Sequence, residues 1–123
     1  MRVLVYGGRD YNNQDQMNGV LDKFHEEYKF TKMINGGQLS RSGEEIFGAD
    51  WQASVWANKN RIPVFFFCAN WRFDEKSAGP IRNQRMMVEG KPEIGIEFPG
   101  GKGTKDMRKR LLAAGITIKE IVW

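Results

Sequence analysis

The sequence predicts an α/β fold, a doubly wound parallel sheet of about five strands in the order 3-2-1-4-5 with helices on both faces. Short apolar, β-branched or aromatic runs alternate along the chain with segments whose apolar residues have helical spacing. Several of these runs lack apolar–polar alternation, as strands buried on both faces do, and glycine-rich segments follow three of them. The five predicted strands lie at residues 3–6, 32–34, 62–68, 94–98 and 116–122.

Helical spacing recurs between the strands. From about Gln14 to Glu27 the apolar residues fall at i, i+3, i+4, i+7 and i+11, and Asn13 with Gln16 forms a helix-starting capping pair. Residues 49–57 and 107–114 repeat the pattern, the second ending at Gly115 as a helix stop, and residues 80–89 form a shorter, weaker helix.

The strands differ in expected burial. The run from Val64 to Phe67 predicts a strand buried on both faces, because crossover helices cover both sides of a parallel sheet. The strand at 116–122 alternates more, and we expect it at an edge.

Length and composition predict one cytoplasmic domain over residues 1–123. The chain is long enough for one core and too short for two ordinary domains, and its formal charge of +4 suits an anionic ligand. Cys68 and His25 are the only residues of their kinds, so we expect a reducing compartment, no disulfide and no metal site. The chain shows neither a secretion signal nor a long apolar run, so we expect no membrane partner.

Two glycine-rich loops carry the strongest functional signal. They follow the first and fourth strands, which are neighbours where the predicted strand order reverses. Glycines there let backbone amides approach an anion, and a helix N-terminus after the second loop adds partial positive charge. We therefore expect a phosphate-bearing ligand, and no resident cofactor, at Gly7, Gly8, Arg9 and Asp10 of the first loop and at Pro99, Gly100, Gly101, Lys102, Gly103 and Thr104 of the second.

Each loop also has a plain structural interpretation. The first can be a surface turn with Arg9 paired to Asp10, and the second a strand-to-helix turn in which Thr104 caps the helix instead of contacting phosphate. Gly36 and Gly37 follow the second strand and make a third such loop, which favours ligand binding for all three.

Two arginines in the weak helix are further candidates. Arg82 and Arg85 are three residues apart on one helix face, which suits two sides of one phosphate or carboxylate, and a solvated basic face is equally consistent.

A second set of basic residues lies in the last helix. We interpret Lys105, Arg108, Lys109 and Arg110 as an exposed helix face, since all four cannot point at one site. Two roles are consistent with Trp71: it stacks on the base of the ligand, or it is an aromatic lid or core residue.

Four motifs occur in order at residues 7–11, 48–50, 79–86 and 99–104. They read Gly-Gly-Arg-Asp-Tyr, Gly-Ala-Asp, Gly-Pro-Ile-Arg-Asn-Gln-Arg-Met and Pro-Gly-Gly-Lys-Gly-Thr. In combination the chain resembles the SLOG superfamily, which includes SMF/DprA proteins and LONELY GUY phosphoribohydrolases, and in particular its small YspA or cpYpsA-related branch. This resemblance implies a Rossmann-like sheet that binds nucleotides or nucleotide-derived signals.

The hydrolases of that superfamily split a nucleoside monophosphate with an arginine and a glutamate. The resemblance puts the arginine at Arg82 and the glutamate position, three residues beyond Thr104, at Met107, which cannot serve as a general acid. Asp106 is one position away and points elsewhere on the helix, by about 100°. A hydrolase here would use Arg82 with Asp106 or Asp10.

A second departure from related sequences is the polar segment 38–47, which separates two motifs that stand closer together elsewhere. It is interpreted either as a ligand lid or as a tolerated surface loop.

Three functions follow from these observations. The first is a sensor or sequestering protein for a nucleotide-derived ligand, and the resemblance to proteins carried by phages and mobile elements implies a nucleotide second messenger. The second is the phosphoribohydrolase just described. The third is single-strand nucleic-acid binding, supported only by the basic excess. The sequence does not decide whether the protein forms a homo-oligomer.

Overall fold

The computed structural model describes residues 1–37, 48–68 and 77–122. Its five strands form one parallel sheet in the order β3-β2-β1-β4-β5, which confirms the predicted doubly wound, Rossmann-like fold. The strands are β1 (Arg2–Tyr6), β2 (Lys32–Asn35), β3 (Val64–Phe66), β4 (Ile94–Glu97) and β5 (Thr117–Glu120).

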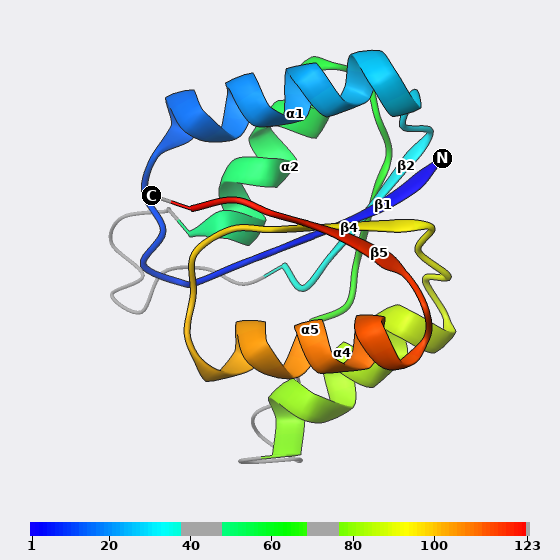
Figure 1. Ribbon diagram of the computed structural model, residues 1–123. Coiled ribbons are helices and arrows are strands. Elements are labelled where there is room, and N and C mark those ends of the chain that lie inside the picture. The colour runs from blue at the N-terminus through cyan, green and yellow to red at the C-terminus, as the bar shows by residue number, and fades with distance from the viewer. Residues whose placement is uncertain (38–47, 69–76, 123) are drawn as a thin grey trace.

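Helices cover both faces of the sheet, as the lack of alternation in the central strands predicts. In Figure 1, α1 and α2 lie over one face and α4 and α5 over the other. The helices are α1 (Gln14–Tyr28), α2 (Ala49–Lys59), α4 (Ala78–Val88) and α5 (Lys102–Ala113). None of those in the described ranges is long and apolar enough to cross a membrane.

Side chains of β1 alternate between two hydrophobic cores. Val3 and Val5 pack with Met17 and Leu21 of α1 and with Trp56 of α2. On the opposite face, the core consists of Leu4, Tyr6, Ile34, Met86, Met107 and Leu111. The central strand is therefore buried on both faces and holds the two helical layers together.

Local signals at the helix ends match the structure. The Asn13 side chain accepts a hydrogen bond from the Gln16 amide at 3.1 Å, which confirms the predicted capping pair at the start of α1. Gly115 follows α5 with a φ of +74°, a left-handed conformation that favours glycine and stops the helix.

The predicted burial of the third strand is wrong. β3 spans only Val64–Phe66 and forms one edge of the sheet, and the residues Phe65 and Phe66 are 46% and 53% exposed. A run of aromatic residues predicts burial on both faces of the sheet, but at this edge strand the consecutive residues Phe65 and Phe66, which point to opposite faces, are both exposed, so neither face is fully covered there. β5 forms the opposite edge, as its alternation predicts.

Candidate functional site

The two glycine-rich loops meet at the carboxyl ends of β1 and β4. The Gly8 amide donates a hydrogen bond to the Pro99 carbonyl at 2.9 Å, and the two strands are paired neighbours. A Cβ at Gly8 would lie 3.0 Å from both the Gly100 Cα and the Pro99 oxygen. This close approach of two backbones requires glycine and brings the predicted loop residues to one place.

Packing accounts for two more of the loop glycines. A Cβ at Gly7 would lie 2.8 Å from the Ala49 Cβ, and one at Gly100 would collide with the Thr104 hydroxyl and lie 2.6 Å from the Gly8 amide nitrogen. A Cβ at Gly101, in contrast, would meet no other atom within 4 Å among the described residues. Gly101 therefore faces open space at the mouth of the loop.

Helix α5 begins directly after this loop. Gly101 is its N-cap and Lys102 and Gly103 are exposed in its first turn, while Thr104 is buried against Gly100. The first amides of a helix lack partners within the helix and carry partial positive charge, so they favour an anion. The loop and the helix start thus form an anion-accepting geometry.

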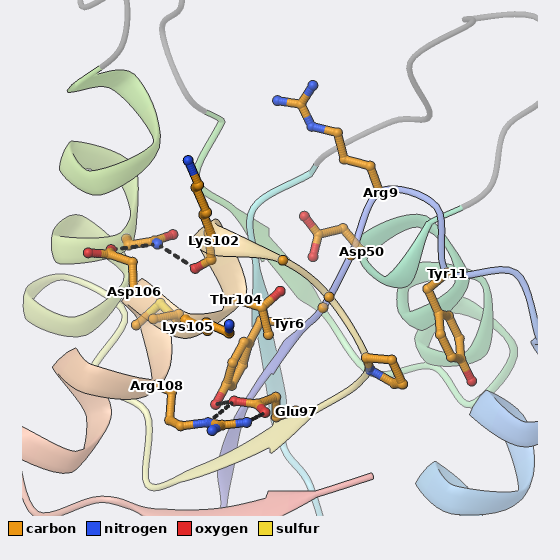
Figure 2. A pocket seen from close by; sticks show the side chains of 18 of the residues that line it. Tyr6, Arg9, Tyr11, Asp50, Glu97, Lys102, Thr104, Lys105, Asp106 and Arg108 are labelled. Atoms are coloured by element: carbon orange, nitrogen blue, oxygen red, sulfur yellow. Dashed lines mark hydrogen bonds and ion pairs between the residues drawn. The ribbon is translucent and has the colours of Figure 1, made fainter. Parts of the chain in front are cut away.

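A cleft of about 1030 Å³ opens around the two loops. This volume suits a nucleotide-sized ligand, because small-molecule sites typically span roughly 300–1,000 Å³. Figure 2 shows Arg9 and Asp50 at one end and Glu97 and Arg108 at the other, with Thr104 and Lys105 between them. Of the predicted site residues, the lining includes Gly7, Gly8, Arg9, Asp10, Arg82, Asp106 and all six from Pro99 to Thr104.

Arg82 lines the cleft from α4 and is 8% exposed. Its guanidinium donates to the Asn83 side chain at 2.9 Å and to the Gly36 carbonyl at 3.3 Å. Burial lowers the pKa of Arg82, and the nearby Asp50 carboxylate opposes that shift. Asp50 is itself buried in the first turn of α2, within the second motif of the sequence, and it lines the same cleft.

Asp106 is held in a network between α4 and α5. Its carboxylate accepts from the Asn83 amide at 2.9 Å and from Arg110 Nε at 2.8 Å. Burial acts to raise the pKa of Asp106, but hydrogen bonds from Arg110 and Asn83 outweigh it and hold the pKa below its ordinary value. Asp106 is therefore a carboxylate at neutral pH and has no proton to donate as a general acid.

Glu97 is a buried charge at the end of β4 that sequence reasoning did not single out. Tyr6 Oη donates to Glu97 Oε1 at 2.9 Å, and the Arg108 guanidinium donates to both Glu97 oxygens. Burial first, then the hydrogen bond to Glu97, raises the pKa of Tyr6. The signal that could have found Glu97 is a lone acidic residue between apolar neighbours in a central strand, immediately before the glycine-rich loop.

The basic run of α5 is not one exposed face, so the interpretation made from the sequence needs correction. Lys105 and Arg108 line the cleft, Arg108 being bound to buried Glu97, while Arg110 pairs with Asp106. Lys109 is exposed and lines a separate shallow groove between α4 and α5.

Three predicted site residues lie off the cleft lining. Arg85 is exposed and pairs with Glu89 at 2.6 Å, so the structure does not bring it to Arg82. Gly36 packs against the Arg82 guanidinium, where a Cβ would lie 2.9 Å from Cζ, and Gly37 has a φ of +62° and donates its amide to the Asn35 side chain. Gly36 therefore contacts the Arg82 guanidinium, and neither of these two glycines lines the cleft itself. Segment 38–47 and Trp71 lie outside the described residues.

Met107, at the glutamate position of the related hydrolases, is 1% exposed and packs with Leu4, Tyr6 and Leu111 in the core. Met107 also borders the cleft from α5, so an apolar side chain stands at the position where the related hydrolases have a carboxylate.

A comparison with protein families places the chain in a known group. The model of the "YspA, cpYpsA-related SLOG family" matches residues 1–73, more than half of the chain. The chain belongs to this SLOG family. The match contains the Gly7–Tyr11 and Gly48–Asp50 motifs, whereas the motifs at 79–86 and 99–104 lie beyond it. No curated protein sequence matches the chain. SLOG membership indicates a nucleotide-related small-molecule ligand.

Proposed function

We propose that this SLOG protein binds a nucleotide-derived ligand through a phosphate seated on the loop formed by residues 99–104, and acts as its sensor or sequestering protein. The observation that carries the proposal is the contact of Gly8 with Pro99. It joins two glycine-rich loops and the N-terminus of α5 in a cleft of about 1030 Å³.

The charges around the loop support the same ligand class. Arg9, Lys102 and Lys105 line the cleft with the helix N-terminus, and Arg82 lies buried behind the loops. Guanidinium and ammonium groups form charge-assisted hydrogen bonds to phosphate oxygens, which are stronger than neutral ones. A Cβ at Gly101, the N-cap of α5, would meet no atom within 4 Å among the described residues, so the start of this helix borders open space.

Binding without turnover fits the residues better than phosphoribohydrolysis. The position that holds a glutamate in the related hydrolases is filled by the core residue Met107, and Asp106 is an ionised side chain engaged by Arg110 and Asn83. Neither residue offers a free acid or base for breaking a glycosidic bond. A protein that binds a nucleotide messenger without cleaving it lowers the free concentration of that messenger. This role suits a protein encoded by a phage or a mobile element.

Native mass spectrometry of the purified protein tests the proposal. A phosphate-bearing nucleotide derivative retained in the native protein, and recovered intact after denaturation, is the expected result. Titration with AMP, ADP-ribose and ribose 5-phosphate should then show saturable binding and a rise in the melting temperature, because ligand bound to the native state stabilises it. Absence of binding across such a panel, with no retained molecule, would contradict the proposed function.

A further inference from the structure

The cleft has two ends with different charged groups. At one end lie the glycine-rich loops, the N-terminus of α5, Arg9 and Lys102, together with the Asp50 carboxylate (Figure 2). At the other end, beyond β4 and β5, lie Glu97, Arg108 and Glu120. Figure 2 shows the Glu97–Arg108 pair at the opposite side of the cleft from Arg9, with Tyr6 alongside.

The second end is an ordered chain of contacts. Tyr6 donates to Glu97, Arg108 grips both Glu97 oxygens, and the same Arg108 Nη2 donates to Glu120 Oε1 at 3.1 Å. The side chain of Glu97 is 4% exposed and that of Glu120 is 56% exposed. Glu120 is thus oriented through one oxygen by an arginine that is itself fixed by a buried carboxylate.

The charges at this end leave an excess of one carboxylate. One guanidinium faces two carboxylates, so the group Glu97, Arg108 and Glu120 has a formal net charge of −1. Carboxylates accept hydrogen bonds and donate none, and the Nε and Nη2 groups of Arg108 already donate to them. A ligand group that contacts the Glu120 carboxylate must therefore supply O–H or N–H donors, and a negative charge on that group would be repelled by the excess carboxylate.

Resting on the proposed function, we infer that Glu120, positioned by Arg108 and Glu97, binds the uncharged, donor-bearing part of the ligand and rejects a second phosphate there. In other doubly wound folds, acidic side chains at strand carboxyl ends accept hydrogen bonds from ribose hydroxyls. Amino groups of bases can donate hydrogen bonds to a carboxylate in the same way. The ligand class is then a nucleoside 5′-phosphate with free ribose hydroxyls or a base amino group toward β5, and its phosphate on the glycine-rich loop.

Isothermal titration with four probes tests this inference. They are AMP, adenosine 3′,5′-bisphosphate, 2′-deoxy-AMP and purine riboside 5′-phosphate, which lacks the amino group. We expect the bisphosphate to bind the unmodified protein at least about tenfold more weakly than AMP, because like charges repel, and this ratio should shrink at high salt. Loss of affinity for 2′-deoxy-AMP assigns the donors to ribose, whereas loss for the purine riboside assigns them to the base.

The variant Glu120→Gln removes the charge from a half-exposed side chain and should bring the affinities for AMP and the bisphosphate within about threefold of each other. Glu93→Gln, which removes an equal charge from an exposed residue paired with Arg2 outside the cleft lining, should leave the ratio unchanged.

The outcomes separate this inference from the proposed function. AMP binding with no discrimination against the bisphosphate, or an equal effect of Glu93→Gln, would overturn the role of Glu120 alone. Unchanged affinity for both 2′-deoxy-AMP and the purine riboside would overturn it as well. Failure of ribose 5-phosphate and every nucleotide to bind would overturn the proposed function, and this inference with it.

Discussion

Arg108 Nε donates to Glu97 Oε1 at 2.8 Å, and its Nη2 donates to Oε2 of the same carboxylate. This pair joins the last residue of β4 to the second turn of α5, so it closes the glycine-rich loop across its base. Tyr6 supplies a third donor from the neighbouring strand β1. The loop is therefore held at its base between Arg108 of α5 and two residues buried in the sheet, Glu97 and Tyr6.

The Tyr6 contact yields the first prediction. Tyr6→Phe removes a buried donor to a charged acceptor, and we expect the free energy of unfolding to fall by about 1–2 kcal/mol in urea denaturation. Tyr28→Phe is the control, because Tyr28 is half-buried and its hydroxyl makes no hydrogen bond within the described part of the chain. Equal decreases in the free energy of unfolding for the two variants would contradict a specific contribution of the Tyr6–Glu97 hydrogen bond.

The second prediction contrasts two adjacent glycines. Gly101→Val projects a side chain into open space, so we expect a folded protein whose affinity for AMP falls at least about tenfold, because the side chain blocks the approach of phosphate to the amides. Gly100→Ala places a Cβ against Thr104 and the Gly8 amide, so we expect it to lower the melting temperature. If the Gly101→Val protein is folded and its affinity for AMP is unchanged, the loop formed by residues 99–104 does not bind the phosphate.

The third prediction separates the two arginines of α4. Arg82→Ala removes hydrogen bonds to Asn83 and Gly36 and should weaken AMP binding at least about tenfold, with a stability loss of about 1–3 kcal/mol. Arg85→Ala removes the same charge from the same helix but outside the cleft lining, and we expect its AMP affinity to stay within about twofold. Equal weakening by both would indicate diffuse electrostatics in place of a site.

The fourth prediction concerns acid stability. The pKa of Asp106 is depressed in the folded protein, so its ionised form contributes stability that is fully present above the ordinary value of 3.8 and is lost as the pH falls through the lower folded value. Asp106→Asn should therefore melt at a lower temperature than the unmodified protein at pH 7. Thermal melts down to about pH 3 should show this difference shrinking below pH 3.8. A constant difference would mean that hydrogen bonding alone accounts for it.

Hydrophobic periodicity and glycine placement are local signals, so the strands, the helices and the loops between them were predictable. The strand order and the meeting of the two loops followed from the usual order of doubly wound folds, which the structure has. The support of Arg82 was not, since only the folded chain shows that Gly36 packs on its guanidinium. Spacing of three residues placed Arg85 near Arg82, yet Glu89 four residues further on is a local partner that holds it outside the cleft. Glu97 was read as part of a strand, because its partner Arg108 is brought to it by the turn into α5.

The last prediction addresses turnover. We expect the unmodified protein to release no free base from AMP at an enzymatic rate, because a positioned acid or base typically contributes about 100-fold to 10,000-fold and Met107 supplies neither. Met107→Glu would place a carboxylate among Leu4, Tyr6 and Leu111, so we expect a stability loss on the order of 2 kcal/mol or more without gain of activity. Met107→Leu keeps the volume and should cost less than about 1.5 kcal/mol. Chromatographic detection of adenine checks all three proteins. Rapid release of adenine by the unmodified protein, abolished by Arg82→Ala, would show phosphoribohydrolase activity and contradict binding of the ligand without turnover.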